Sequence, residues 1–265
     1  MSVERSLEFE IEVDGTPDEV WRAVATGPGV SSWYVPHAIE ERVGGGAIAS
    51  FGPGPEMQVS GRVAVWEPPA RVVFDGGEGV PGLAFELLVE PRGSGSCLVR
   101  LVNSGFSDEE EWDAQYDGMA YGWQLFLLNL KLHLQHFRGQ VATSMLPTAT
   151  WSGPRDRAWT HLLGALGISA DVVAGAHIEI DQPDAPPLAG TVADVAPWRI
   201  AIVLDEPAPG TAFLTAEGDS DQISISIWSY LYGRAGAVAA ERDGQRWQQW
   251  LENHSMSETT GIDNN

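Results

Sequence analysis

The chain opens with an alternation of apolar and acidic side chains. Residues 7–13, LEFEIEV, keep this alternation over the length of one strand, which is typical of a strand with one buried face. The period then changes, because residues 16–19, TPDE, combine an N-cap hydroxyl, a proline at the first helical position and two acids in the first turn. An apolar stripe follows over residues 20–24, so we expect a short helix that ends at residues 27–29, GPG.

Short β-like runs separated by turns rich in Gly and Pro fill the next segment. They cover residues 37–43, 46–52, 56–66, 71–75, 83–90 and 97–103. Because no helical pattern lies between them, they predict an antiparallel meander. A capping box at residues 107–110, SDEE, then begins a helix that continues to about Phe137. Such a helix can bury its apolar stripe only against the concave face of the twisted meander.

The second half of the chain repeats this order in a degraded form. Residues 153–167 parallel the early helix, residues 190–202 parallel residues 61–74, and residues 244–254 parallel residues 121–130. The offsets between matching segments shrink along the chain, which indicates that the second copy has lost residues. The pattern therefore predicts an α+β protein with two copies of one fold. Two unrelated α+β units that share a common rhythm are the alternative.

These patterns give provisional domain boundaries. We expect a first domain at residues 1–140 and a second, shortened domain at residues 151–254. Residues 141–150 are weakly patterned and contain Pro147, so we interpret them as a linker. Residues 255–265 are polar, and we expect a disordered tail.

Charge and targeting signals narrow the possible partners. The net charge is −22, with 15 Lys and Arg against 37 Asp and Glu. Nucleic acids and anionic membrane surfaces are poor partners, because both are bound by clustered cations.

The single cysteine, Cys97, excludes an internal disulfide and a multi-cysteine metal site. The N-terminus lacks the pattern of a signal peptide, and the apolar run at residues 125–134 contains Lys131 and is too short to span a bilayer. We therefore expect a cytoplasmic protein.

An ordered series of short motifs in the first half resembles the START-like (SRPBCC) superfamily. The motifs are Trp33-Tyr34, Gly45-Gly46, GRV at 61–63, PPARVVF at 68–74, NSGF at 103–106 and Gly122-Trp123. Within the superfamily, residues 7–138 look most like the branch named after the activator of the heat-shock chaperone ATPase. The resemblance implies a helix-grip (START/Bet v-like) architecture, in which a curved antiparallel sheet and a long C-terminal helix enclose an apolar cavity for hydrophobic small molecules. The second half looks like a divergent copy without the Trp-Tyr and Gly-Gly elements.

Candidate ligand-binding residues lie on the long helix and on the strands. One face of the helix carries, at helical spacing, Tyr116, Met119, Ala120, Trp123 and Leu127. This stripe either lines an open pocket or forms plain core. Inward-facing strand residues that complete the wall are Phe51, Met57, Val59, Phe85 and Leu87, if the strand parity holds. The resemblance places Trp33 and Tyr34 at the pocket mouth, although one of them could instead staple the early helix to the sheet.

Signals for catalysis, metals and cofactors are weak. His37 lies near the expected mouth and is the best single candidate for a general base, but the sequence identifies no partner for it. His133 and His136 lack further ligands at metal-binding spacing, so we interpret them as a solvent face that complements the helix dipole. Asn103 lies at the end of a strand, where it could orient a ligand, but because it precedes Ser104-Gly105 we interpret it as a turn-former. We expect no metal and no cofactor.

Three functions follow from these observations and from the resemblance. The first is non-enzymatic binding of a hydrophobic small molecule in the cavity of the first domain. The alternative is an enzyme of the polyketide cyclase or dehydratase kind, which would need an ionisable side chain aimed into the cavity. The family name implies a third function, regulation of a chaperone ATPase. The second domain is then a partner surface or a vestigial copy, and a protein partner or a homodimer remains open.

Overall fold

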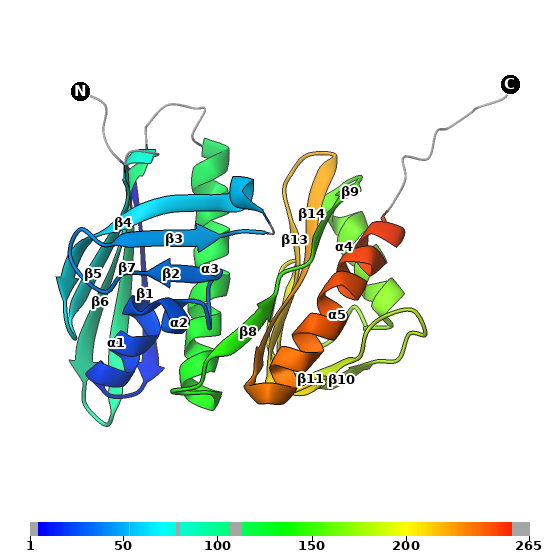
Figure 1. Ribbon diagram of the computed structural model, residues 1–265. Helices are drawn as coiled ribbons and strands as arrows, with labels where there is room; N and C mark the ends of the chain where they lie inside the picture. Colours follow the sequence, from blue (N-terminus) through cyan, green and yellow to red (C-terminus); the bar gives the residue numbers. More distant parts are fainter. Residues whose placement is uncertain (1–4, 53, 78–79, 107–112, 256–265) are drawn as a thin grey trace, which may run out of the picture. The chain divides into compact units, whose positions relative to one another are not determined.

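The computed structural model describes residues 5–52, 54–77, 80–106 and 113–255. The chain divides into two compact units, Met1–Ala142 and Thr143–Asn265. Each unit contains a seven-stranded sheet and ends in a long helix (Figure 1). None of the helices among the described residues is long and apolar enough to cross a membrane.

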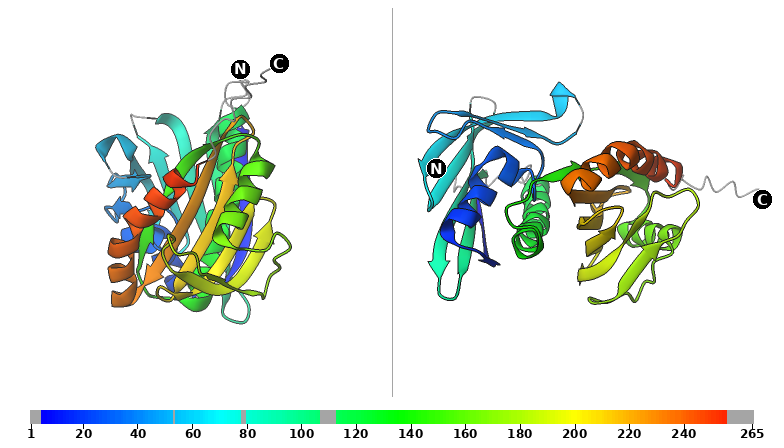
Figure 2. Two further views of the ribbon diagram at one scale, coloured as in Figure 1. Left: turned by 90° about the vertical axis from the view of Figure 1, so that its right-hand side faces the viewer. Right: turned by 60° about the horizontal axis from the view of Figure 1, so that its bottom comes forward.

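The first unit is a meander closed by its own first strand. Its elements are β1 (Arg5–Asp14), α1 (Pro17–Ala25), α2 (Gly27–Val30), β2 (His37–Ile39), β3 (Gly46–Ser50), the 3-10 turn η1 (Pro55–Met57), β4 (Gln58–Glu67), β5 (Arg71–Gly76), β6 (Val80–Arg92), β7 (Ser96–Phe106) and α3 (Asp113–His136). The strand order is β1-β7-β6-β5-β4-β3-β2, and each neighbouring pair is antiparallel. Figure 2 shows this sheet curving, with α1 and α3 on its inner side.

Local sequence explains the start of this unit. In β1 the apolar side chains of Leu7 and Val13 are buried, while Glu10 lies on the outer face and accepts a 2.8 Å hydrogen bond from Arg100. Helix α1 begins with the predicted capping box, because Thr16 accepts from the backbone of Glu19 and the Glu19 carboxylate accepts from the backbone of Thr16. The expectation that residues 27–29 only end the early helix needs correction. These residues follow the end of α1, but they also begin α2. Thr26 caps the N-terminus of α2.

The second unit has a shorter set of elements. They are β8 (Ala142–Met145), β9 (Thr148–Ser152), α4 (Arg155–Leu166), β10 (His177–Ile180), β11 (Leu188–Ala196), β12 (Arg199–Glu206), β13 (Gly210–Glu217), β14 (Gln222–Tyr232) and α5 (Gly233–Asn253). The strand order is β10-β11-β12-β13-β14-β8, and β9 also pairs with β14. Helices α4 and α5 pack on one face of this sheet around a core that includes Leu162, Ile202, Leu214, Ile225 and Trp247.

The two units share one topology. In each unit a strand near the N-terminus pairs with the last strand, the remaining strands form a consecutive meander, and a long helix follows. Counting back from the last strand, the hairpin β11–β12 corresponds to β4–β5, as the parallel sequence segments predicted. Within the described residues, the second unit has no counterpart of α2 and β2, the segment that carries Trp33-Tyr34 in the first unit. The prediction of an α+β protein with tandem copies is confirmed.

The expected linker is the main departure from the predicted organisation. Residues 141–150 contain β8 and the start of β9, both of which pair with β14. The weak pattern arises because these two strands are short and Pro147 interrupts them. The capping box at residues 107–110 and the expected disordered tail, apart from Ser255, lie outside the described residues.

Candidate functional site

An aromatic cluster lies between the sheet and α3 in the first unit. The turn after α2 places the Tyr34 ring at its centre, 5.1 Å from the Trp123 ring and 4.4 Å from the Phe126 ring between centroids. The Phe51 ring lies 6.1 Å from Tyr34 in an edge-to-face arrangement. Tyr34 is buried, and burial raises its pKa above the usual value, so its hydroxyl stays neutral at physiological pH. The cluster joins the loop after β3, the turn after α2 and helix α3 at a single apolar surface.

Trp33 has a different environment from its neighbour. Its side chain is fully buried, its indole N–H donates to the carbonyl of Ala23 at 2.9 Å, and its own carbonyl accepts from Asn129 Nδ2 at 3.1 Å. These bonds tie α1 and α3 to the turn between α2 and β2. The geometry therefore favours the staple role for Trp33, and leaves Tyr34 as the residue of the pair that contacts the rest of the cluster.

Three of the residues proposed for the wall, Phe85, Leu87 and Val59, lie in strands on the face toward α3, whereas Phe51 directly follows β3 and Met57 ends η1. Phe85 is 5.5 Å from the Trp123 ring, and Leu87 has the same parity on β6. On the β3–β4 hairpin, Phe51 pairs with Met57 through a backbone hydrogen bond of 2.9 Å, and Val59 opposes Ala49 on the same face. Leu87 is fully buried, whereas Phe51, Met57 and Val59 are 42 %, 42 % and 45 % exposed. The inner face of the sheet is therefore packed at β6 and open at the end of the β3–β4 hairpin.

The side chains of the helix stripe also change from buried to half-buried along α3. Leu127 and Trp123 are buried, whereas Met119 and Ala120 are half-buried. Tyr116 lies in α3, but its side chain is outside the described part of the structure. The packed end of the stripe thus lies toward the C-terminus of α3.

The interpretation of Asn103 as a turn-former is wrong. It does not form a turn; it lies in β7, directly opposite Phe85 on β6, and is 1 % exposed. Among the described residues, its Oδ1 has no hydrogen-bond partner, and the same holds for Trp123 Nε1. The signal that could have found it is strand parity, because Asn103 continues the buried alternation of Cys97, Val99 and Leu101.

His37 begins β2 beside the aromatic cluster. Its ring is 5.2 Å from the Tyr34 ring, and its Nδ1 lies 2.7 Å from the carbonyl oxygen of Val35. Because a carbonyl only accepts, Nδ1 carries the proton, and Nε2 keeps the basic lone pair. Burial lowers the pKa of His37, against a smaller opposite effect of the Val35 hydrogen bond. The imidazole is therefore neutral at physiological pH.

The two histidines of α3 do not form one solvent face. His133 is 2 % exposed, and burial lowers its pKa to about 4, so it is uncharged and does not complement the helix dipole. His136 is exposed, as expected. Among the described residues, no group of three or more His, Cys, Asp or Glu side chains is arranged to hold a metal ion.

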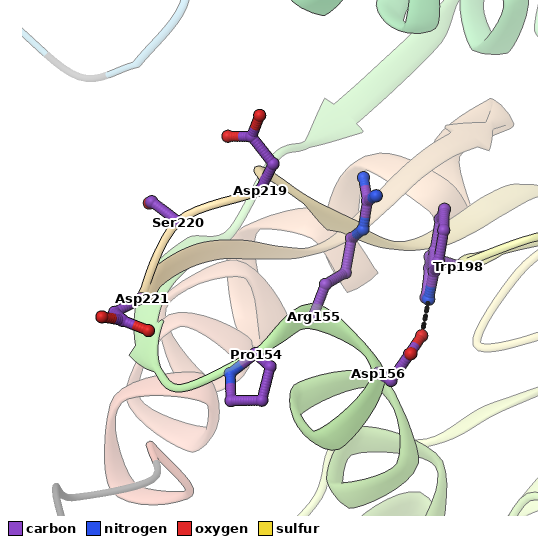
Figure 3. A pocket seen from close by; sticks show the side chains of 7 residues that line it. All are labelled: Pro154, Arg155, Asp156, Trp198, Asp219, Ser220 and Asp221. Carbon is purple, nitrogen blue, oxygen red and sulfur yellow. Dashed lines mark hydrogen bonds between the residues drawn. The ribbon is translucent and has the colours of Figure 1, made fainter.

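A surface pocket in the second unit has a different character (Figure 3). Its volume is about 480 Å³, and its lining is Pro154, Arg155, Asp156, Trp198, Asp219, Ser220 and Asp221. The Arg155 guanidinium lies 3.6 Å from the centroid of the Trp198 ring, and Trp198 Nε1 donates to Asp156 Oδ1 at 2.6 Å. The pocket is lined by none of the candidate ligand-binding residues that the sequence predicts. Three carboxylates and one guanidinium make it unsuited to a hydrophobic ligand.

Comparison with known proteins shows a family match to the first unit. Residues 14–135 match the family described as "Activator of Hsp90 ATPase homolog 1-like protein". The resemblance of the first unit is thereby confirmed. The match spans strands β2–β7, the aromatic cluster and nearly all of α3, and it ends before the second unit begins. None of the curated proteins matches this sequence.

Several solved structures are similar to the chain. The di-domain ARO/CYC BexL of the BE-7585A biosynthetic pathway is 16 % identical, with 96 % of this chain and 99 % of BexL covered and a TM-score of 0.45. The Aha1 dimer of Colwellia psychrerythraea is 21 % identical, with 51 % and 99 % covered and a TM-score of 0.43. CalU16 of Micromonospora echinospora is 23 % identical, with 50 % and 78 % covered and a TM-score of 0.40.

Proposed function

We propose that the first unit binds a hydrophobic small molecule between its sheet and α3. The observation that carries this proposal is the exposure of Phe51, Met57 and Val59 at the end of the β3–β4 hairpin, where the Phe51 ring contacts Tyr34. Inner-face side chains of a sheet normally lie under the covering helix, and apolar side chains gain about 25 cal/mol per Å² when they leave water. Three exposed apolar side chains at one end of the hairpin form an apolar surface that a ligand would cover.

Binding of an apolar fluorescent probe tests this proposal. We expect anilinonaphthalene sulfonate to bind the folded protein with increased fluorescence, and Val59→Asn to weaken its binding by about tenfold, because a buried amide without a partner opposes the apolar contact. Val43→Asn is the matched control, because Val43 is also exposed, at 62 %, but lies in the turn between β2 and β3. Equal losses in both variants, or no binding by the unmutated protein, would overturn the proposal.

Native mass spectrometry gives an independent test. A binder should retain a small molecule from the cells in which the protein is made, and its mass should disappear in Val59→Asn but persist in Val43→Asn. The two variants separate retention at the inner face from attachment elsewhere on the surface.

A cyclase- or dehydratase-like reaction is the second candidate, and the geometry of His37 favours it. A neutral imidazole with Nδ1–H held by a carbonyl and a free Nε2 has the form of a general base. In a dehydration, Nε2 would remove the proton next to a ketone and then pass it to the neighbouring hydroxyl, whose C–O bond breaks as water leaves and the C=C bond forms. An aryl β-hydroxyketone is a suitable probe, because loss of water to the conjugated enone is followed by ultraviolet absorbance.

The enzyme hypothesis predicts that His37→Gln abolishes this reaction while binding of the fluorescent probe remains. His177→Gln is the control, because His177 is an exposed histidine in the second unit. Turnover that is the same in both variants, or absent from the unmutated protein, would leave the binding function as the activity of this site.

A further inference from the structure

Two polar atoms at the buried end of the aromatic cluster lack hydrogen-bond partners among the described residues. They are Oδ1 of Asn103, an acceptor, and Nε1 of Trp123, a donor. Asn103 is 1 % exposed and Trp123 is 3 % exposed, so bulk water does not reach them freely. An unpaired buried polar group costs on the order of 1–3 kcal/mol. Two such groups in one small region need a physical explanation.

The two atoms belong to side chains that share one neighbour, Phe85. Asn103 on β7 stands directly opposite Phe85 on β6, so both side chains project from the same face of the sheet. The Trp123 ring lies 5.5 Å from the Phe85 ring. Phe85 is therefore the shared neighbour of both polar groups. The groups are complementary, since one accepts and the other donates, yet they do not bond to each other.

The surroundings of the pair connect it to solvent along an apolar surface. Trp250 Nε1 in the second unit is also buried without a partner among the described residues, but its ring packs on Trp247 and stacks on His254, and not on an exposed apolar surface. Trp123 contacts Tyr34, and Tyr34 contacts the half-exposed Phe51. The unpaired atoms of the first unit thus lie at the inner end of an apolar surface whose outer end faces solvent.

We infer that the ligand of the first unit is a ring compound with a hydroxyl group, which donates to Asn103 Oδ1 and accepts from Trp123 Nε1. A hydroxyl is the smallest group that can do both at once. The ring would lie among Tyr34, Phe85 and Phe51, where aromatic side chains favour edge-to-face or offset contacts. This inference rests on the proposed binding function and names the chemistry that the site selects.

A pair of probes that differ in one hydroxyl tests the inference. The probes are 2-naphthol and naphthalene, and isothermal titration calorimetry gives the affinity of the full chain for each. The measured quantity is the ratio of the two affinities, because it cancels the contribution of the shared rings. Since a hydrogen bond contributes about 1 kcal/mol, each of the two bonds should favour 2-naphthol by about fivefold.

Two single substitutions remove the polar atoms one at a time. Asn103→Leu and Trp123→Phe should each lower the ratio of 2-naphthol to naphthalene affinity about fivefold and leave naphthalene affinity within twofold. Both keep an apolar side chain of similar or smaller size, and neither breaks a hydrogen bond to a described residue. Trp250→Phe is the matched control, because it removes an equally unpaired indole N–H from the second unit.

Each outcome has a distinct meaning. If neither probe binds the unmutated protein, the proposed function fails. If both probes bind and the ratio is the same in the unmutated protein, Asn103→Leu and Trp123→Phe, the proposed function stands and the hydroxyl inference is overturned. A fall of the ratio in Trp250→Phe as large as in Trp123→Phe would also overturn it. Thermal unfolding shows whether each variant is folded, and either of the two single variants alone decides the question.

Discussion

The two units build the same topology with different interiors. In the second unit, the face of the sheet that packs against α4 and α5 is filled by aliphatic side chains such as Ile202, Leu214 and Ile225, all fully buried. In the first unit, the corresponding face carries aromatic side chains, and Phe51 and Met57 remain 42 % exposed. The same topology therefore encloses a filled core in the second unit and leaves an apolar surface open to solvent in the first unit.

The difference follows from one segment of sequence. The first unit has α2 and β2, and the turn between them carries Tyr34, the centre of the aromatic cluster. The described part of the second unit has no such segment, and its meander begins one strand later at β10. Without this segment, the described part of the second unit has no counterpart of Tyr34, which joins Phe51, Trp123 and Phe126 in the first unit. The comparison teaches that the aromatic cluster depends on a segment present only in the first unit and not on the shared topology.

Substitution of one tryptophan in each unit should give the largest effect. Trp247→Ala in α5 removes a side chain that is 1 % exposed in a filled core, so we expect a loss of about 3–5 kcal/mol in the free energy of unfolding. Trp123→Ala should cost less, about 2 kcal/mol, because Trp123, although buried, belongs to a cluster that is open at its other end, so neighbouring rings can move into much of the space. Hydrogen–deuterium exchange with peptide resolution reports each unit separately. Equal losses would mean that Trp123 is ordinary core.

Acid should destabilise the first unit through His133. Its pKa is about 4 in the folded protein, below the usual 6.5, so the folded state binds fewer protons than the unfolded state between these values. Stability is therefore retained above pH 6.5 and lost as the pH falls toward 4, by up to about 3 kcal/mol. His133→Gln should remove this pH dependence, as measured by urea unfolding at several pH values. His136→Gln, on the exposed side of α3, should leave it unchanged.

The N-terminal cap of α1 should have a smaller effect. Thr16→Ala removes the hydroxyl that accepts from the backbone of Glu19, and we expect a loss of about 1 kcal/mol in the stability of the first unit. Thr16→Ser keeps the hydroxyl and should be nearly neutral. Helix α4 of the second unit has Pro154 at the same position, without a side-chain hydrogen bond, so this contribution belongs to the first copy alone. A neutral Thr16→Ala variant would contradict it.

The elements with local signals were predictable from the sequence. The alternation in residues 7–13, the capping box at Thr16 and the turns of the meander each depend on neighbouring residues, and the structure has the corresponding strands and helix. The similar sequence patterns of residues 61–74 and residues 190–202 also identified the repeat. Residues 141–150 were misjudged because β8 and β9 form through pairing with β14, a partner about eighty residues later.

The candidate site was predictable in its apolar part and not in its polar part. Strand parity and helical spacing selected residues such as Phe85 and Trp123, which do contact each other. The local sequence of Asn103 favours a turn, and only its place in the register of β7 buries it. His133 was misjudged for the same reason, since its charged neighbours in sequence say nothing about the tertiary contacts that bury it. Buried polar residues depend on packing that one sequence does not encode locally.

The outer face of the first sheet should contribute least. Arg100 and Glu10 form a 2.8 Å ion pair across β7 and β1, but their side chains are 40 % and 50 % exposed. An exposed pair gains little because water and salt screen it, so Arg100→Gln should change the free energy of unfolding by less than about 0.5 kcal/mol. Urea unfolding at low and high salt measures this, and the small difference should vanish at high salt. A loss comparable to that of Trp123→Ala would show that the outer face, and not the inner one, controls the stability of this unit.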